Sequence, residues 1–263
     1  PPRNPVKASW PRPVPDITGY AYRDYGNCCG FWRLLEAMDS CGMRGTVSLN
    51  VAMCDHHPEI IAECAERGWE FFSHGTYNGR YLYNMSEDQE RRVIEDSIAT
   101  FRKHTGQSLD GWLAPALTYT EHTFDIVAEM GIRYVCDLFH DDQPGPLKTR
   151  KGRLISLPYS IEVNDTGSFN VYRLSPRRYC ETLKRQFDRL YEEGEESGTV
   201  MCAPLHPYLV GHPHRIGAFE EALSYITRHD KVWLATGREI ANHFIDNYFD
   251  AFREASQPVG EVS

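Results

Sequence analysis

The sequence predicts an α/β fold, a single (β/α) barrel that is distorted or incomplete and has about seven parallel strands. Two observations favour this architecture. Short β-rich runs alternate with amphipathic helical segments along the chain, and such alternation gives a parallel sheet covered by helices. The chain has 263 residues, and no long linker or repeat separates the elements after residue 20. One barrel therefore accounts for the chain more economically than two doubly wound domains.

The N-terminal segment 1–20 is expected to be an extended, proline-rich arm that lies over the barrel. Its prolines are Pro1, Pro2, Pro5, Pro11, Pro13 and Pro15. Proline fixes φ and lacks an N–H group, which opposes both helices and central strands. Residues 21–263 are predicted to form the barrel, which is the catalytic domain.

Helices are predicted where apolar residues recur at spacings of three and four, and where capping signals occur. Pro58 suits a first turn, and Gly68 ends that helix. Ser86 with Gln89 forms a capping box, as does Thr118 with Glu121. The first box opens a helix that is expected to bury Val93, Ile94, Ile98 and Phe101 and to end at Gly106. The predicted helices are 31–43, 58–67, 86–105, 118–130, 175–193, 215–228 and the segment from Thr236 onward.

Strands are predicted where short apolar runs rich in β-branched and aromatic residues lie between these helices. The predicted strands are 46–51, 69–73, 109–113, 132–136, 154–163, 199–205 and 231–235. All of them except 132–136 are followed by a predicted helix, so the strands are expected to run parallel.

Composition excludes several classes of protein. Lys and Arg total 28 against 37 Asp and Glu, a formal net charge of -9 that argues against a nucleic-acid partner. No stretch approaches ~18 uncharged apolar residues, so no membrane span is expected. The 8 cysteines include no C-x-x-C pair, and the chain is long enough to fold without disulfides. We expect mostly reduced cysteines and a cytoplasmic protein.

Polar side chains follow four of the predicted strands. His74 follows 69–73, Asp137 follows 132–136, Asn164 follows 154–163 and His206 follows 199–205. In a barrel the carboxyl ends of the strands meet on one rim, where the active site forms. We therefore expect His74 and His206 to face each other across that rim.

Each of these residues also has a purely structural interpretation. Asp141 and Asp142 precede Pro144 and could cap a turn, and Asn164 with Asp165 could form an Asx turn. Trp112 could be a packing residue. His57, before Pro58, is expected to form the turn that precedes a helix, whereas His212 and His214 could line the mouth of the site.

Several motifs occur together in a familiar order. They are His74-Gly75 after Trp69-Glu-Phe-Phe-Ser73, Gly111-Trp112 with Pro115, Leu205-His206-Pro207-Tyr208, Tyr25-Gly26-Asn27 with Gly30-x-Trp32-Arg33, Asp141-Asp142, Leu157-Pro158-Tyr159 with Asn164-Asp165, Leu190-Tyr191-Glu192-Glu193-Gly194, and Asp230-Lys231-Val232-Trp233. Together they resemble the polysaccharide deacetylase (NodB-like) superfamily over residues 20–245. Within it, the match is closer to the bacterial allantoinases and cyclic imide hydrolases. The resemblance implies a NodB-like barrel that hydrolyses carbon–nitrogen bonds other than peptide bonds.

The sequence departs from the metal-dependent sugar deacetylases, which carry an Asp-Asp pair on the first strand and a His-x-x-x-His motif. Here Asn78 stands four residues after His74, and the acidic first strand is absent or upstream of Pro1. The allantoinase branch is thought to work without a metal, which favours no cofactor. A divalent metal such as zinc stays an alternative, with His74, His206 and Asp24 as the ligands on offer.

The expected reaction opens a small cyclic amide, imide or ureide. His74 or His206 would be the general base, because the pKa of histidine lies near neutrality, and the other ring would polarise the carbonyl or protonate the leaving nitrogen. Asp24 or Asp142 would orient one imidazole.

The substrate is expected to be a flat ring. Trp112 and Tyr208 would flank this ring, and Asn164 would bind its imide group. The alternatives are a metal-dependent carbohydrate N- or O-deacetylase and a degenerate, non-catalytic barrel that binds ligands. A homo-oligomer is also expected.

Overall fold

The structure is a computed structural model that describes residues 15–255, and these form two compact units. The sheet unit contains Thr46–Cys54, Glu70–Pro158 and the chain from Thr236 onward. The helical unit contains the chain up to Gly45, Asp55–Trp69 and Tyr159–Ala235. The predicted barrel segment 21–263 therefore contributes to both units.

The sheet unit is built on one six-stranded sheet, in the order β1-β2-β3-β4-β6-β5. Its strands are β1 Thr46–Leu49, β2 Glu70–Ser73, β3 Gly111–Trp112, β4 Tyr134–Val135, β5 Gly145–Leu147 and β6 Leu154–Ser156. All neighbouring pairs are parallel except β5 and β6, which are antiparallel. The mostly parallel α/β architecture predicted from the alternation is thus confirmed.

Three predicted features of the sheet were wrong. No strand is assigned to 199–205 or 231–235, although both lie within the described residues. The predicted strand 154–163 ends at Ser156, and Ile161–Val163 is a 3₁₀ turn instead. β5 was missed because Pro146 argues against a strand. Its edge position explains the proline, since an outer strand can leave one N–H side unpaired.

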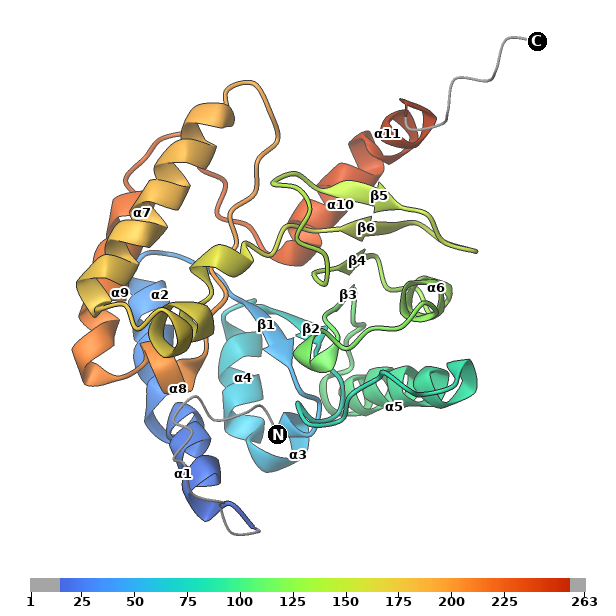
Figure 1. The fold of residues 1–263 in the computed structure, drawn as a ribbon, viewed down its shortest axis with the longest axis horizontal. Coiled ribbons are helices and arrows are strands. Elements are labelled where there is room, and N and C mark those ends of the chain that lie inside the picture. The colour runs from blue at the N-terminus through green and yellow to red at the C-terminus, as the bar shows by residue number, and fades with distance from the viewer. Residues whose placement is uncertain (1–14, 256–263) are drawn as a thin grey trace. The chain divides into compact units, whose positions relative to one another are not determined.

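The helices of the sheet unit follow their capping signals closely. They are α5 Glu87–Thr105, α6 Thr123–Glu129, α10 Gly237–Asn247 and α11 Phe249–Ala255, and Figure 1 shows α5 beside α6. Ser86 and Gln89 form the predicted capping box. The box predicted at Thr118 was wrong, because its hydroxyl donates to the Pro115 carbonyl and accepts from the Leu82 N–H. α6 therefore begins five residues later than predicted.

The helical unit contains the remaining long helices. They are α1 Ile17–Tyr25, α2 Phe31–Ser40, α4 Pro58–Glu66, α7 Pro176–Glu193, α8 Pro207–Val210 and α9 Pro213–Ile226, with π-helical turns at Gly26–Gly30 and Gly167–Val171. The short helix α3 Met53–His56 joins the units along the chain. Figure 1 shows α7 and α9 side by side.

Most of the predicted proline-rich arm, residues 1–14, lies outside the described residues. The end of the arm is not extended as predicted, because α1 begins at Ile17. Asp16 is its N-cap and accepts a hydrogen bond of 2.9 Å from the Gly19 N–H. The prolines end at Pro15, so nothing in the sequence opposes this helix.

Two further predictions concern the whole chain. All eight cysteines lie within the described residues, and no disulfide joins any of them, as predicted. Among residues 15–255, no helix is long and apolar enough to cross a membrane.

Two glycines bring the start of the helical unit against the segment that follows His206. A Cβ atom on Gly30 would collide with the carbonyl group of Pro207, and one on Gly26 would touch the Tyr208 N–H. Arg33 ties the same regions together, because its guanidinium donates to the Tyr25 hydroxyl and to the Gly211 carbonyl.

Substituting Gly30→Ala should therefore destabilise the protein by ~1–3 kcal/mol, because backbone must move to admit the methyl group. The matched control is Gly217→Ala within α9, where a Cβ would meet nothing within 4 Å. That change should be neutral or stabilising by up to ~1 kcal/mol, since alanine favours helices. Chemical denaturation measures both free energies of unfolding, and equal effects would contradict this account of the packing.

Candidate active site

In the helical unit, His206 is paired with a buried carboxylate, Asp165. Nδ1 of His206 lies 2.6 Å from Oδ1 of Asp165, and the backbone N–H of His206 donates to Oδ2 of the same carboxylate at 2.7 Å. His206 is the N-cap of α8, with Pro207 at the first helical position. Asp165 is anchored in turn by its own N–H, which donates to the Pro204 carbonyl.

The Asp165 carboxyl group is fully buried, whereas 35% of the His206 side chain is exposed. Burial alone would lower the pKa of His206, but the charge and the hydrogen bond of Asp165 outweigh it and raise that pKa above the ordinary value. Because Nδ1 faces the carboxylate, Nε2 is the atom through which His206 can exchange a proton. Such a dyad can act as a general base and then hold the imidazolium.

Aromatic rings extend from His206 to the first helix of the unit. The ring of Tyr208 meets that of His206 edge-on at 5.6 Å, and Tyr22 meets Tyr208 at the same distance. His212 stacks on Tyr25 at 4.3 Å. Burial raises the pKa of Tyr208, so its hydroxyl stays protonated near neutral pH. These rings give the dyad an apolar, aromatic border.

Two other predicted residues of this unit serve local structure. Asn164 forms an Asx turn, as its Oδ1 accepts from the Thr166 N–H at 2.8 Å. The prediction that Asp24 orients a catalytic imidazole was wrong for His206, whose partner is Asp165. Asp24 instead accepts from the Asn27 side chain and lies 3.8 Å from His57. His57 is the N-cap of α4, as the sequence predicted.

The sheet unit holds His74, directly after β2. Its N–H donates to the Leu49 carbonyl, and its own carbonyl accepts from the Asn50 side chain at 2.7 Å. Nδ1 lies 2.8 Å from the Leu113 carbonyl oxygen. Gly75 follows with φ +70°, in the left-handed region, and a Cβ there would press on Pro115. These contacts fix His74 at the carboxyl end of the parallel sheet.

Asp137 is a buried carboxyl group at the same end of the sheet, after β4. It is 2% exposed, and its Oδ1 accepts from the Ala114 N–H at 2.8 Å. Burial raises the pKa of Asp137 to about 7, although the Ala114 hydrogen bond opposes the shift. Sequence reasoning placed Asp137 at a strand end but gave it no role.

The other predicted residues of the sheet unit have different surroundings. Trp112 is fully buried, and its Nε1 has no hydrogen-bond partner in the described structure. Its surroundings therefore indicate that it is a packing residue. Asp142 is exposed on a loop, and Asp141 next to it caps a turn by accepting from the Gln143 N–H. His74 and His206 lie in different units, so their predicted meeting across one rim stays a prediction.

The donor groups do not fit a metal centre. Catalytic zinc takes about three protein ligands. Among residues 15–255 no group of three or more His, Cys, Asp or Glu side chains is placed to hold a metal ion. Within the helical unit, Asp24 lies beside His57 while His206 lies beside Asp165. The ligands that the sequence offered therefore do not assemble there.

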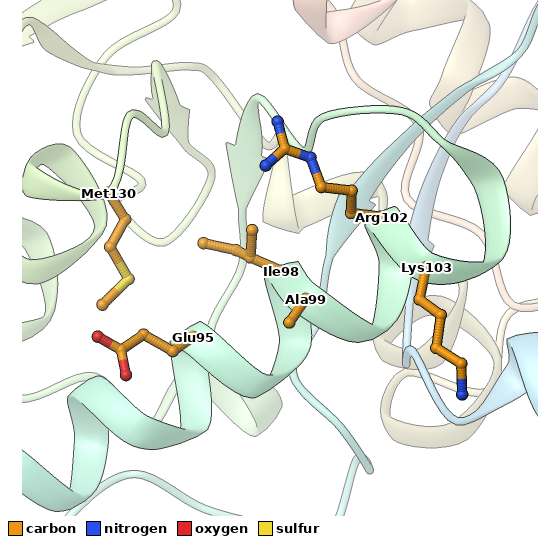
Figure 2. Close-up of a pocket in the computed structure, with 6 residues that line it drawn as sticks. All are labelled: Glu95, Ile98, Ala99, Arg102, Lys103 and Met130. Atoms are coloured by element: carbon orange, nitrogen blue, oxygen red, sulfur yellow. The ribbon is translucent and has the colours of Figure 1, made fainter.

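The surface of the sheet unit has an open depression with a volume of about 530 Å³. Figure 2 shows the side chains that line it, and none of them is a predicted site residue. Its lining residues are Glu95, Ile98, Ala99, Arg102, Lys103 and Met130. The prediction that Ile98 is buried was wrong, since it is only half-buried at this depression. The other three apolar residues predicted on that face, Val93, Ile94 and Phe101, are buried.

Comparisons with known proteins decide the family. Residues 18–135 match the polysaccharide deacetylase family. The crystal structure of a probable polysaccharide deacetylase from Pseudomonas aeruginosa is 30% identical, with a TM-score of 0.81, and the match covers 88% of this chain and 78% of that one. The chain belongs to the polysaccharide deacetylase family. As such it is a hydrolase of carbon–nitrogen bonds other than peptide bonds.

Two other proteins are also similar to this chain. The crystal structure named Puue allantoinase is 27% identical, with a TM-score of 0.82, and the match covers 88% of this chain and 77% of that one. A peptidoglycan deacetylase of Helicobacter pylori is 24% identical over 222 residues, covering 71% of this chain and 74% of the relative. The proteins similar to this chain thus include one named for a ureide and one named for a polysaccharide.

Removing the charge of Asp165 should change the protonation of His206. In Asp165→Asn the burial of His206 is no longer opposed, so its pKa should fall below that of the wild type. An NMR titration of the His206 ring measures this pKa directly. An unchanged value in the folded variant would show that the carboxylate does not control this histidine.

Proposed function

We propose that this hydrolase opens a carbon–nitrogen bond of a small cyclic amide, imide or ureide with an activated water. The observation that carries the proposal is the pairing of His206 with the fully buried Asp165. A histidine held in this way can take a proton from water without a metal ion, and no group of three or more His, Cys, Asp or Glu side chains among residues 15–255 is placed to hold one.

Each proton transfer in the proposed reaction has a defined donor and acceptor. Nε2 of His206 takes a proton from water as the oxygen attacks the carbonyl carbon of the ring, which gives a tetrahedral oxyanion. Asp165 stabilises the imidazolium that results. The imidazolium then returns its proton to the ring nitrogen as the carbon–nitrogen bond breaks. The product is the opened acid with a free amide or amine end.

Other residues are proposed to bind the ring of the substrate. Tyr208 is the strongest of these, because its ring meets His206 edge-on and its hydroxyl stays protonated. We keep Asn164, Trp112 and Asp142 as substrate-binding proposals. Asn164 already accepts from the Thr166 N–H, and its amide nitrogen donates to the Tyr159 hydroxyl at 3.3 Å. The second N–H of that amide is therefore the part proposed to bind a ligand.

His74 is proposed to join the reaction from the sheet unit, where it polarises the carbonyl or protonates the leaving nitrogen. The 27% identity with a structure named as an allantoinase supports a ureide-like substrate. The name of the Helicobacter pylori relative favours the second candidate, a metal-dependent carbohydrate deacetylase.

Replacing the base tests the mechanism. His206→Ala should lower kcat by ~10²–10⁴-fold while the fold stays intact, because general-base catalysis contributes about that much. The matched control is His56→Ala, an exposed histidine of the same chain, which should leave kcat unchanged. Circular dichroism confirms folding. An unchanged kcat in folded His206→Ala would remove His206 from the reaction.

A substrate panel separates the two candidate functions. Purified protein should open allantoin, succinimide or a hydantoin, followed by ring-opening absorbance, and should keep that activity after treatment with a chelator. Release of acetate from an N-acetylated oligosaccharide, lost on chelation and restored by zinc, would instead establish the carbohydrate deacetylase.

A further inference from the structure

One peptide group at the carboxyl end of the sheet is bound on both sides by ionisable side chains. The Leu113–Ala114 peptide accepts at its carbonyl oxygen from Nδ1 of His74, and its N–H donates to Oδ1 of Asp137, each at 2.8 Å. The three participants follow β2, β3 and β4, which are neighbours in the sheet.

We propose that Asp137 is a positioning residue for His74 and acts through the Leu113–Ala114 peptide group. The assignment of a catalytic part to His74 rests on the proposed function. The link from Asp137 to His74 rests on the geometry alone.

The link fixes the tautomer of His74. A carbonyl oxygen can only accept a hydrogen bond, so Nδ1 must carry the hydrogen. In the neutral ring Nε2 then carries no proton. It is the nitrogen that can take up a proton or accept a hydrogen bond from a substrate. A carboxylate on the N–H side polarises the peptide group and makes its carbonyl a stronger acceptor. Asp137 therefore favours both this orientation and a positive charge on the ring.

A purely structural acceptor for Ala114 would not need to be an acid. An amide or hydroxyl oxygen accepts one N–H equally well, whereas a buried carboxylate is costly to ionise. Oδ2 of Asp137 is buried and makes no hydrogen bond within the described structure. Burial also raises the pKa of Asp137 to about 7. A buried acid at such a position points to a function.

The loop that carries the peptide group is held in a strained form. Ala116 and Leu117 have φ of 52° and 58°, in the left-handed region that side chains disfavour. Thr118 anchors this turn through the Pro115 carbonyl, and Pro115 packs against Gly75. The loop is thereby kept against His74, so the peptide group has little freedom to swing away.

The test replaces the charge and keeps the hydrogen bond. Asp137→Asn retains an oxygen that can accept from Ala114. With ¹⁵N-labelled histidine, NMR should show a smaller share of the Nδ1–H tautomer and a lower pKa for His74 than in the wild type. Ring-opening kcat should fall by about 10-fold, the order found when a group that orients a functional histidine is lost.

The matched control is Glu70→Gln, a second buried carboxyl group at the opposite end of β2, which bonds Tyr134 and the Arg238 N–H. It should leave the His74 tautomer and pKa unchanged. Asp137→Ser is a further variant without charge, should the asparagine variant fail to fold.

A His74 tautomer and pKa unchanged in a folded Asp137 variant, or changed equally by Glu70→Gln, would overturn the proposal. The NMR measurement needs no substrate. Failure of the proposed function would appear as absence of ring opening in the wild type, whereas failure of this link would appear in the His74 signals alone.

Discussion

The interaction on which the rest of this account depends is the pairing of a fully buried carboxylate with a partly exposed histidine. Asp165 has no exposure to water, and two contacts from His206, one through its ring and one through its backbone, compensate its charge. The same pairing engages Nδ1, so that Nε2 is the nitrogen on the other side of the ring, and it raises the pKa of the ring. The same pairing therefore compensates the buried charge of Asp165 and prepares His206 to act as a base. The close packing of Gly26 and Gly30 on the segment after His206 places that base beside an aromatic border.

The sheet unit also orients a histidine with the help of a buried carboxyl group, but through an intervening peptide group. Parallel strands end at one edge, so β2, β3 and β4 deliver His74, the Leu113–Ala114 peptide and Asp137 to adjacent positions. In the helical unit a carboxylate touches its histidine directly, whereas here a peptide group stands between the two. In both units the ring nitrogen Nδ1 is held by an oxygen, so the two histidines favour the same tautomer, with the hydrogen on Nδ1.

Much of the fold follows from local signals in the sequence. The capping box at Ser86 and the apolar spacing in α5, α7 and α9 predicted helices that the structure contains. Predictions failed where tertiary context prevails over local pattern. The Thr118 hydroxyl hydrogen-bonds Pro115 and Leu82 rather than a helix end, and Pro146 is tolerated because β5 is an edge strand. The helix after Asp16 was missed for a different reason, because its N-cap is a local signal that follows the last proline of the segment.

The site was predictable to the extent that strand ends converge. The ends of the predicted strands pointed to His74 and His206. His74 does follow a strand of the sheet, whereas no strand is assigned before His206, which is the N-cap of α8. Their partners were not predicted, because the sequence offered several acids and no means to choose among them. Asp165 was assigned to a turn with Asn164, and the actual turn uses only Asn164.

The most direct measurement of the role of His206 as the base is the pH dependence of kcat/KM for ring opening. We expect its acidic limb to report a pKa above that of an ordinary histidine and to move to lower pH in Asp165→Asn. A limb that stays in place in that variant would contradict the assignment of His206 as the base.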